Sequence, residues 1–347
     1  MILSWSFWVA TATAAIAPPF VVFQDGVKEL FGPSPTVEVL YENKSIPFAH
    51  EAGVFIPQDN TLFVTSNRFK DPATQEQRIV ITRVSLPPSD DTKSAKVEEV
   101  RTDNVPMANG GVNYKDGIVF CAQGTAKMSS GISFMESKPP YKSELLLTSY
   151  LNRTFTSPND LVAHTDESIW FTDPIYGFEQ GFRPRPRLPS QVYRFDPKQK
   201  SVRAMADGLG RPNGISFSPD QKILYVTDTD FIHGDGTTDD TRASTIYAYD
   251  VVTATGQPFL ANKRLFAMAD TGIPDGVKCD VRGNVYSGCG DGVNIWSPGG
   301  QLIGKILVEG GVANFCFGRN GEIFMLNENR LLRAKLAPTT RGALLGI

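Results

Sequence analysis

Six segments of the sequence begin with a side chain that carries an oxygen donor and continue with small or apolar residues. The donors are Glu51, Asn109, Asn159, Asn213, Asp275 and Asn314, and each is followed after 9 to 11 residues by a second apolar segment. Carboxylate and amide oxygens are hard ligands, and a large set with two carboxylates suits Ca²⁺ better than the small octahedral shell of Mg²⁺. The alternative is turn chemistry, because Asn, Asp and Gly are common turn residues. We interpret the pattern as one Ca²⁺ site, with a different divalent cation as a variant.

The segments that would position these donors form a repeat. The second apolar segments cover residues 62–66, 118–122, 169–173, 224–228, 285–288 and 323–326, each directly after a turn. Units of about 40–60 residues, each readable as a meander of about four short strands, are typical of a propeller. The repeat therefore predicts an all-β fold, a six-bladed β-propeller whose inner strands bring the six donors to one mouth of a central channel.

The two ends of the repeat predict how the ring closes. Residues 36–41 read as a strand without a hairpin partner, and residues 331–336 end a short last unit. Pairing these two segments removes two sheet edges that would otherwise promote aggregation. We therefore expect the N-terminal strand to complete the last blade, and residues 18–347 to form one domain.

Composition limits the classes of partner. The net charge is −3 without a basic run, which argues against a nucleic-acid partner, and 41% hydrophobic residues provide a packed core. The cysteines show no C-x-x-C pair, so a zinc site is not predicted; they are Cys121, Cys279, Cys289 and Cys316. The expected partner is a small organic substrate, and the expected oligomeric state is a monomer.

The N-terminal residues resemble a targeting segment. Residues 2–17 are uncharged and apolar, end in small residues and precede Pro18 and Pro19. They are short for a membrane span, so we predict a signal peptide over 1–17, a secreted protein and no membrane contact in the mature form. The alternatives are a short anchor and a docked N-terminal segment. The sequons at Asn43 and Asn152 predict glycosylation.

Four long loops on the donor side would form the pocket walls. They span residues 68–77, 124–140, 174–190 and 231–242. The third carries Tyr176 and Phe178, which we expect to contact the substrate together with Asn109 and Asn159. Its two arginines, Arg183 and Arg185, are expected in solvent.

Residues 35–340 resemble the calcium-dependent gluconolactonase/regucalcin-like family, and in particular its secreted fungal lactonase branch. The motifs that carry the resemblance are His50-Glu51-Ala52, residues 157–162 with 169–177, residues 211–220, and Pro274-Asp275-Gly276. The resemblance implies a six-bladed propeller, cleavage of lactones or phosphotriester-like esters, and a Ca²⁺ ligand set. That set is Glu51, Asn159, Asn213 and Asp275.

Two functions fit this pocket. In the first, a hydrolase opens a lactone: Ca²⁺ polarises the carbonyl, and Asp275 either activates water or attacks directly. His50 would then belong to the core, because neighbouring residues of a strand point to opposite faces. In the second, the pocket guides a stereoselective cyclisation in secondary metabolism, which the aromatic loop favours. Ser157 also favours it, since several family members have a sugar-acid-binding Arg there. A binding propeller without catalysis is the third option.

Overall fold

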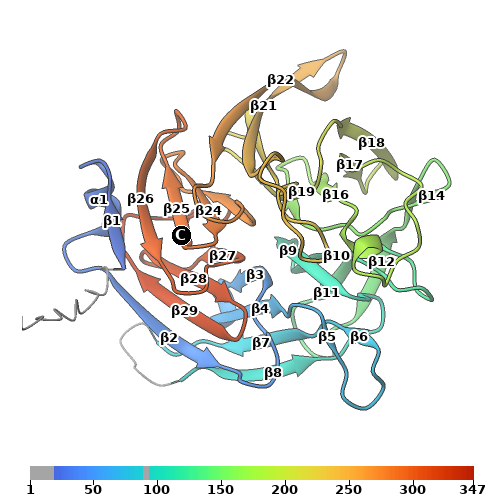
Figure 1. The fold of residues 1–347 in the computed structure, drawn as a ribbon, viewed down its shortest axis with the longest axis horizontal. Helices are drawn as coiled ribbons and strands as arrows, with labels where there is room; N and C mark the ends of the chain where they lie inside the picture. Colours follow the sequence, from blue (N-terminus) through green and yellow to red (C-terminus); the bar gives the residue numbers. More distant parts are fainter. Residues whose placement is uncertain (1–18, 89–93) are drawn as a thin grey trace, which may run out of the picture.

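The blades of a six-bladed propeller account for nearly all of the chain. The computed structural model describes residues 19–88 and 94–347, so the predicted signal peptide, residues 1–17, lies outside the described residues. Six antiparallel sheets of four or five strands stand around a central axis (Figure 1). The all-β propeller predicted from the repeat is confirmed.

The strands of each blade are ordered from the axis outward; in blades 5 and 6 the outermost strand comes from the N-terminal region. Blade 1 is β3 (Glu51–Ile56), β4 (Thr61–Thr65), β7 (Ile81–Ser85) and β8 (Lys96–Val100). Blade 2 is β9 (Ala108–Tyr114), β10 (Gly117–Ala122), β11 (Gly131–Glu136) and β12 (Ser143–Leu147). Blade 3 is β15 (Leu161–Ala163), β16 (Ile169–Asp173), β17 (Gln191–Asp196) and β18 (Ser201–Ala206).

The second half of the ring has the same design. Blade 4 is β19 (Pro212–Phe217), β20 (Ile223–Asp228), β21 (Thr245–Ala254) and β22 (Gln257–Met268). Blade 5 is β23 (Val277–Cys279), β24 (Val285–Cys289), β25 (Gly292–Trp296), β26 (Leu302–Leu307) and, from the N-terminal region, β1 (Phe20–Val22). Blade 6 is β27 (Asn314–Phe317), β28 (Glu322–Asn327), β29 (Arg330–Lys335) and β2 (Thr36–Glu42).

Short elements occupy the connections. Two small hairpins pair β5 (Phe69–Lys70) with β6 (Gln77–Arg78), and β13 (Ser149–Tyr150) with β14 (Arg153–Thr154). The helical elements are α1 (Val27–Phe31), the 3₁₀ turn η1 (Pro57–Asp59) and α2 (Tyr176–Glu179). No helix in the described part of the chain has the length and apolar character of a membrane span.

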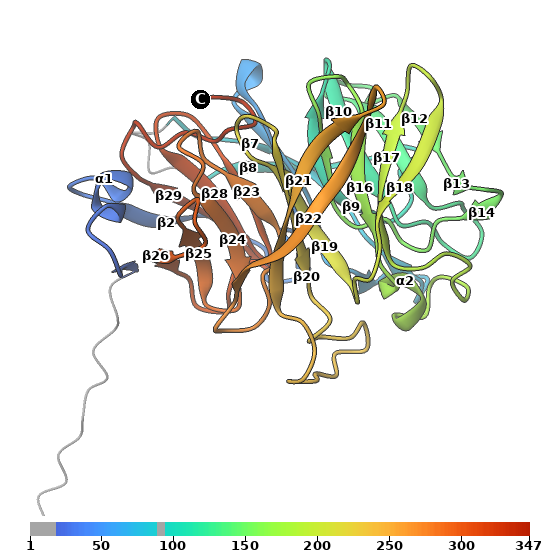
Figure 2. The ribbon, with the colours of Figure 1, turned by 90° about the horizontal axis from the view of Figure 1, so that it is seen from above.

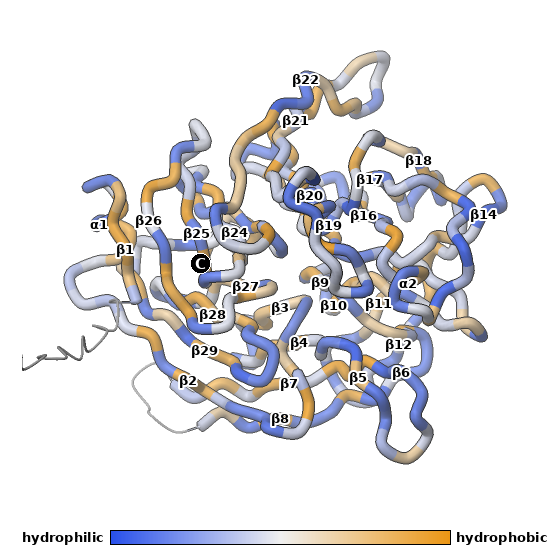
Figure 3. Tube along the Cα trace, viewed as in Figure 1, coloured by the Kyte–Doolittle hydropathy of each residue, from blue (hydrophilic) through white to orange (hydrophobic). Residues whose placement is uncertain are grey.

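The core lies between neighbouring blades. Strands β4 and β10 are buried at every position, because each blade is covered on both faces. Such strands are continuous apolar runs instead of an alternation of apolar and polar residues. Figure 3 shows hydrophobic residues along the blades and hydrophilic residues in many of the connecting loops. The four cysteines are buried free thiols.

The ring closes as the sequence predicts. Strand β2 pairs antiparallel with β29, with Val37 opposite Ala334 and Val39 opposite Leu332. Strand β1 adds a fifth strand to blade 5, and the Phe20 ring packs edge-on against Phe31 of α1 at 5.2 Å. This second N-terminal strand was not predicted.

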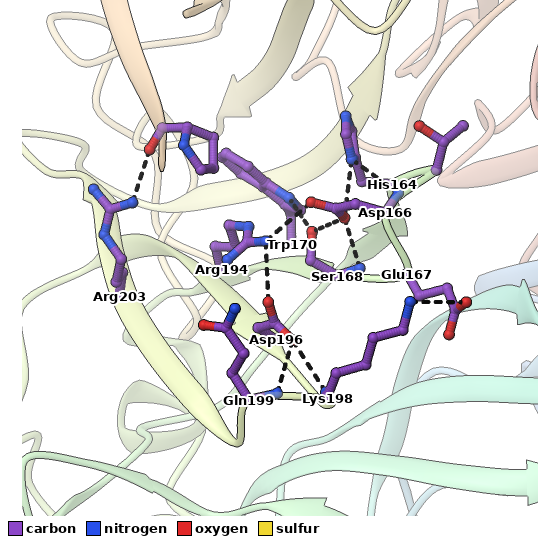
Figure 4. Close-up of polar contacts among 12 residues, drawn as sticks. His164, Asp166, Glu167, Ser168, Trp170, Arg194, Asp196, Lys198, Gln199 and Arg203 are labelled. Atoms are coloured by element: carbon purple, nitrogen blue, oxygen red, sulfur yellow. Dashed lines mark hydrogen bonds and ion pairs between the residues drawn. The ribbon is translucent and has the colours of Figure 1, made fainter. Parts of the chain in front are cut away.

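A polar network on blade 3 lies at the end of the ring away from the donors. In the turn between β15 and β16, Asp166 accepts hydrogen bonds from the Ser168 backbone at 2.8 Å and from Arg194 at 2.9 Å (Figure 4). The Ser168 hydroxyl in turn accepts from the Trp170 indole at 3.0 Å. These groups hydrogen-bond to one another within blade 3, so we assign the network a structural role.

Candidate active site

A cavity of about 360 Å³ opens where the inner strands begin. Its lining includes five of the six predicted donors: Glu51, Asn109, Asn159, Asn213 and Asp275. They come together because each stands at, or within two residues of, the start of β3, β9, β15, β19 or β23. Figure 2 shows that α2 and the loop after β20 lie on one side of the ring and the C-terminus on the other.

The amide and carboxylate oxygens in this cavity lack partners. The Oδ1 atoms of Asn109, Asn159, Asn213 and Asp275 are buried and accept no hydrogen bond from any described residue. One buried polar atom without a partner costs about 1–3 kcal/mol. Several orphaned oxygens around one cavity, with Glu51 beside them, fit a divalent cation bound by oxygen ligands. Within the described ranges, no three His, Cys, Asp or Glu side chains are placed so that they could hold a metal ion together, so amides must share the ligation.

The sixth donor, Asn314, supports Glu51. Its Nδ2 donates to Glu51 Oε2 at 2.7 Å, and its own Oδ1 accepts from the Phe315 backbone at 2.8 Å. Both ends of the Asn314 amide are therefore engaged within the protein. It orients a carboxylate of the site and offers no oxygen to the cavity.

The two carboxylates of the site resist ionisation. Burial, followed by the charge of Asp275, raises the pKa of Glu51 to about 8. Burial raises the pKa of Asp275 to about 6. Asp275 as a whole is half-buried, but its Oδ1 atom is fully covered. The charge of His50 lowers both pKa values but does not outweigh burial, so a bound cation would supply positive charge that the pair still lacks.

His50 also lines the cavity, contrary to the expected core position. The alternation of side chains does not apply, because β3 begins only at Glu51 and its pairing is irregular between Ala52 and Val54. The His50 Nδ1 lies 2.6 Å from Glu328 Oε1, and Asn67 donates to Glu328 Oε2 at 3.2 Å. Burial would lower the pKa of His50, but the charge of Glu328 outweighs it and raises the pKa to about 9.

The two aromatic residues predicted to contact the substrate differ in position. Tyr176 lines the cavity, is buried, and its hydroxyl hydrogen-bonds to Thr229 Oγ1. Phe178 is 41% exposed and does not belong to the cavity lining. Both lie on α2, where residues two apart point to nearly opposite sides of the helix. Tyr176 therefore faces the cavity and Phe178 does not, and a substrate contact stays a prediction.

The expected solvent position of Arg183 is wrong. Its guanidinium is buried and donates to Thr156 O at 2.9 Å, Thr125 O at 2.6 Å and Ser130 Oγ at 3.0 Å. It joins the loops of blades 2 and 3, whereas Arg185 is exposed as expected. The supposed loop 124–140 also differs, since it contains β11.

Ser157 has a structural role. Its hydroxyl donates to Pro174 O and accepts from the Gly177 backbone, both at 2.9 Å. The side chain thus holds the start of α2 against the segment before β15 that carries Asn159.

Three further residues of the cavity lining were not predicted as site residues. Arg68, Gln180 and His233 line the mouth from three loops that were predicted as walls. A single polar residue in a loop carries no pattern, so only the loop conformation reveals which side chains turn inward.

The opposite end of the channel holds a second cavity of about 210 Å³, lined in part by residues 342–345 and Ile347. No acidic side chain from the described residues lines it, and Lys278 is its charged member. The unpartnered oxygens of the predicted donors therefore line the first cavity and not the second.

The two predicted glycosylation sites differ in exposure. Asn152 lies in an exposed turn, whereas Asn43 is half-buried and its Oδ1 accepts from the Ser45 backbone at 2.9 Å. Glycosylation at both stays a prediction.

Comparisons with known proteins place these features in context. Residues 41–326 match the family model "SMP-30/Gluconolactonase/LRE-like region". The lactonohydrolase oryL of Aspergillus oryzae is 30% identical over 321 residues, which cover 85% of this chain and 68% of that protein. A gluconolactonase of Zymomonas mobilis is 28% identical over 242 residues, covering 66% of this chain and 63% of that protein.

A solved structure agrees with these matches. The gluconolactonase XC5397 of Xanthomonas campestris superimposes with a TM-score of 0.71 at 26% identity, over 92% of this chain and 95% of that one. The chain spans about two thirds of the length of the two curated relatives. The cyclase alternative receives no support from these comparisons.

Proposed function

Because the chain belongs to the SMP-30/gluconolactonase/LRE-like family, we propose that it is a calcium-dependent lactonase that opens a cyclic ester in the donor-lined cavity. The observation that carries the proposal is the set of buried, unpartnered oxygens of Asn109, Asn159, Asn213 and Asp275 beside Glu51. Two of the relatives described above are named as a lactonohydrolase and a gluconolactonase.

Four residues would hold the cation: Glu51, Asn159, Asn213 and Asp275. The two carboxylates balance the charge of a divalent cation, and the two amide oxygens complete the set. Such a set favours Ca²⁺ over Mg²⁺, because Ca²⁺ accepts longer ligand distances and a less regular geometry. When bound, the ion supplies positive charge that polarises the lactone carbonyl. Asn109, whose Oδ1 is also free, remains available to a substrate hydroxyl.

Asp275 is the proposed general base. Its carboxylate takes a proton from water, the water oxygen forms a bond to the carbonyl carbon, and the ring C–O bond breaks. The proton passes to the departing ring oxygen, so the product is an open-chain hydroxy acid and no other reactant is consumed. The Asp275 carboxylate is available for this role because its Oδ1 is unpartnered and lies in the cavity wall.

His50 would assist from the same wall. Glu328 engages Nδ1 of His50 at 2.6 Å, which fixes the ring and leaves Nε2 as the nitrogen that can donate to a substrate oxygen. The ion pair with Glu328 thus makes His50 a positioned hydrogen-bond donor beside Glu51.

The test is lactone hydrolysis by the purified protein at saturating Ca²⁺, with wild type, Asp275→Asn and the matched control Asp116→Asn. Asp116 is exposed in the β9–β10 turn, at the far end of the blade. Asp275→Asn should lower kcat by roughly 10²–10⁴-fold, whereas Asp116→Asn should equal wild type. A Ca²⁺-loaded wild type that opens no lactone of any ring size would refute the function, and full activity of Asp275→Asn would refute the base.

A further inference from the structure

Arg68 stands out among the cavity residues because its charge is nearly without partners. It follows β4 and lines the cavity, and it is half-buried. Its guanidinium makes one long hydrogen bond, from Nη2 to Gly234 O at 3.4 Å. Burial lowers the pKa of the group, with no compensating carboxylate beside it.

The carboxylates around the cavity are each engaged elsewhere. Glu328 binds His50 and Asn67, and Glu179 accepts from Arg211 and from the Gly234 backbone. Asp235 accepts from Thr237 in its own loop at 2.7 Å, and Glu51 and Asp275 belong to the proposed cation site. Within residues 19–88 and 94–347, no acidic side chain forms an ion pair with Arg68.

Other buried arginines of the chain show what a structural role requires. Arg183 donates to backbone and hydroxyl oxygens of three loop segments. Arg211 forms ion pairs with Glu179 and Asp230. An arginine offers five N–H donors in a planar fork. Arg68 uses one of them on a weak contact, so most of its hydrogen-bonding capacity remains unused.

The direction of the Arg68 side chain is also defined. Arg68 comes from blade 1 and reaches Gly234 in the loop of blade 4, which stands across the ring. Nearby, Gln77 Nε2 donates to Gln180 O at 3.0 Å, so the loops of blades 1 and 3 meet at the same mouth. The guanidinium is therefore held over the cavity and not turned away into solvent.

We propose that Arg68 forms a carboxylate-binding subsite, and that the substrate is a small lactone carrying an ionised carboxylate. The proposal rests on the lactonase function given above and specifies its substrate class. The planar fork matches two carboxylate oxygens, and such charge-assisted pairs are strong in partly desolvated sites. A cavity of about 360 Å³ lies near the lower end of ligand sites, about 300–1,000 Å³, and so suits a single small ring.

The experiment compares two lactones of nearly equal size: γ-butyrolactone with a γ-carboxylate, and γ-valerolactone, which has a methyl group at the same position. Wild type at saturating Ca²⁺ should show a kcat/KM roughly 10- to 100-fold higher for the acidic lactone. Arg68→Gln should remove this preference, mainly through a higher KM. Arg101→Gln is the matched control, because the Arg101 side chain is 90% exposed, and it should retain the preference.

Each outcome decides one of the two proposals. If wild type opens both lactones equally, or if Arg68→Gln slows both to the same extent, the subsite is wrong and the lactonase function stands. If wild type opens neither of these two lactones, the function is decided by the other ring sizes described above, and the subsite is tested by calorimetric titration with glutarate. Binding weakened at least about 10-fold in Arg68→Gln would support the subsite, and equal binding would overturn it. Should Arg68→Gln melt well below wild type, Arg68→Lys serves in its place, because it keeps the charge and loses the fork.

Discussion

Replacing Asp275 by asparagine should stabilise the cation-free protein. In the absence of a cation, the Asp275 carboxylate is the charge that burial disfavours, and its pKa rises from the ordinary 3.8 to about 6. A raised pKa means that the folded state binds the proton more tightly than the unfolded state. The free energy of unfolding therefore falls as pH rises from about 4 to 6, and it stays reduced at pH 8.

The structure sets the size of this effect. A shift of about two units corresponds to about 3 kcal/mol at 1.36 kcal/mol per unit, and it is an upper bound because Asp275 is partly exposed at the mouth. An unfolding entropy of about 2.1 cal/mol/K per residue over 347 residues makes 1 kcal/mol equal to about 1.4 °C. Asp275→Asn should therefore melt about 1–4 °C above wild type at pH 8 in the presence of a chelator.

Calcium should reverse this order. At a concentration of about 100 times Kd, the ion stabilises wild type by about 2.7 kcal/mol, and the variant, with one carboxylate fewer, gains less. Differential scanning calorimetry at pH 8, with chelator and with Ca²⁺, measures both effects, and Asp116→Asn should follow wild type in each. A variant that melts below wild type in chelator, or that gains as much as wild type from Ca²⁺, would refute the reasoning about the unpaired carboxylate.

Two further predictions concern the framework of the site. Arg183→Gln should lower the melting temperature in a thermal scan by about 3–5 °C, because Thr156 O and Thr125 O lose their hydrogen-bond donor at a buried loop junction. Arg185→Gln, on the exposed side of the same loop, should leave the melting temperature unchanged. Deleting residues 1–42 should expose the edge of β29 and cause aggregation, which size-exclusion chromatography would detect. A truncated chain that stays monomeric with an unchanged melting temperature would contradict the role of β2 in closing the ring.

The fold and the convergence of the donors were predictable because both depend on position within a repeat. Each donor stands at, or within two residues of, the start of the innermost strand of its blade, and a propeller places equivalent positions side by side around the axis. The sequence register alone therefore brought Glu51, Asn159 and Asp275 to one cavity. Strand β1 was not predicted, since its three residues extend a blade that is already complete.

The roles of individual side chains depended on their neighbours instead of their types. Asn314 has the same amide as Asn159, but Glu51 lies within reach of its Nδ2, so it became a support. Tyr176 and Phe178 have similar side chains, and the turn of α2 sends only one of them to the cavity. Loop and helix conformation decides such cases, and no repeat constrains it.

The arginines of the cavity walls also differ in role because their neighbours differ. Arg68, Arg183 and Arg185 all lie in loops that follow a second blade strand; sequence reasoning placed Arg183 and Arg185 in solvent and gave Arg68 no individual role. In the structure, Arg185 is exposed, Arg183 is saturated by oxygens of neighbouring loops, and Arg68 keeps one long bond inside the cavity. What distinguishes a structural cation from a binding one is the number of acceptors that the fold places around it. An arginine held in a cavity with its donors unused is therefore a group to which a ligand can supply the missing acceptors.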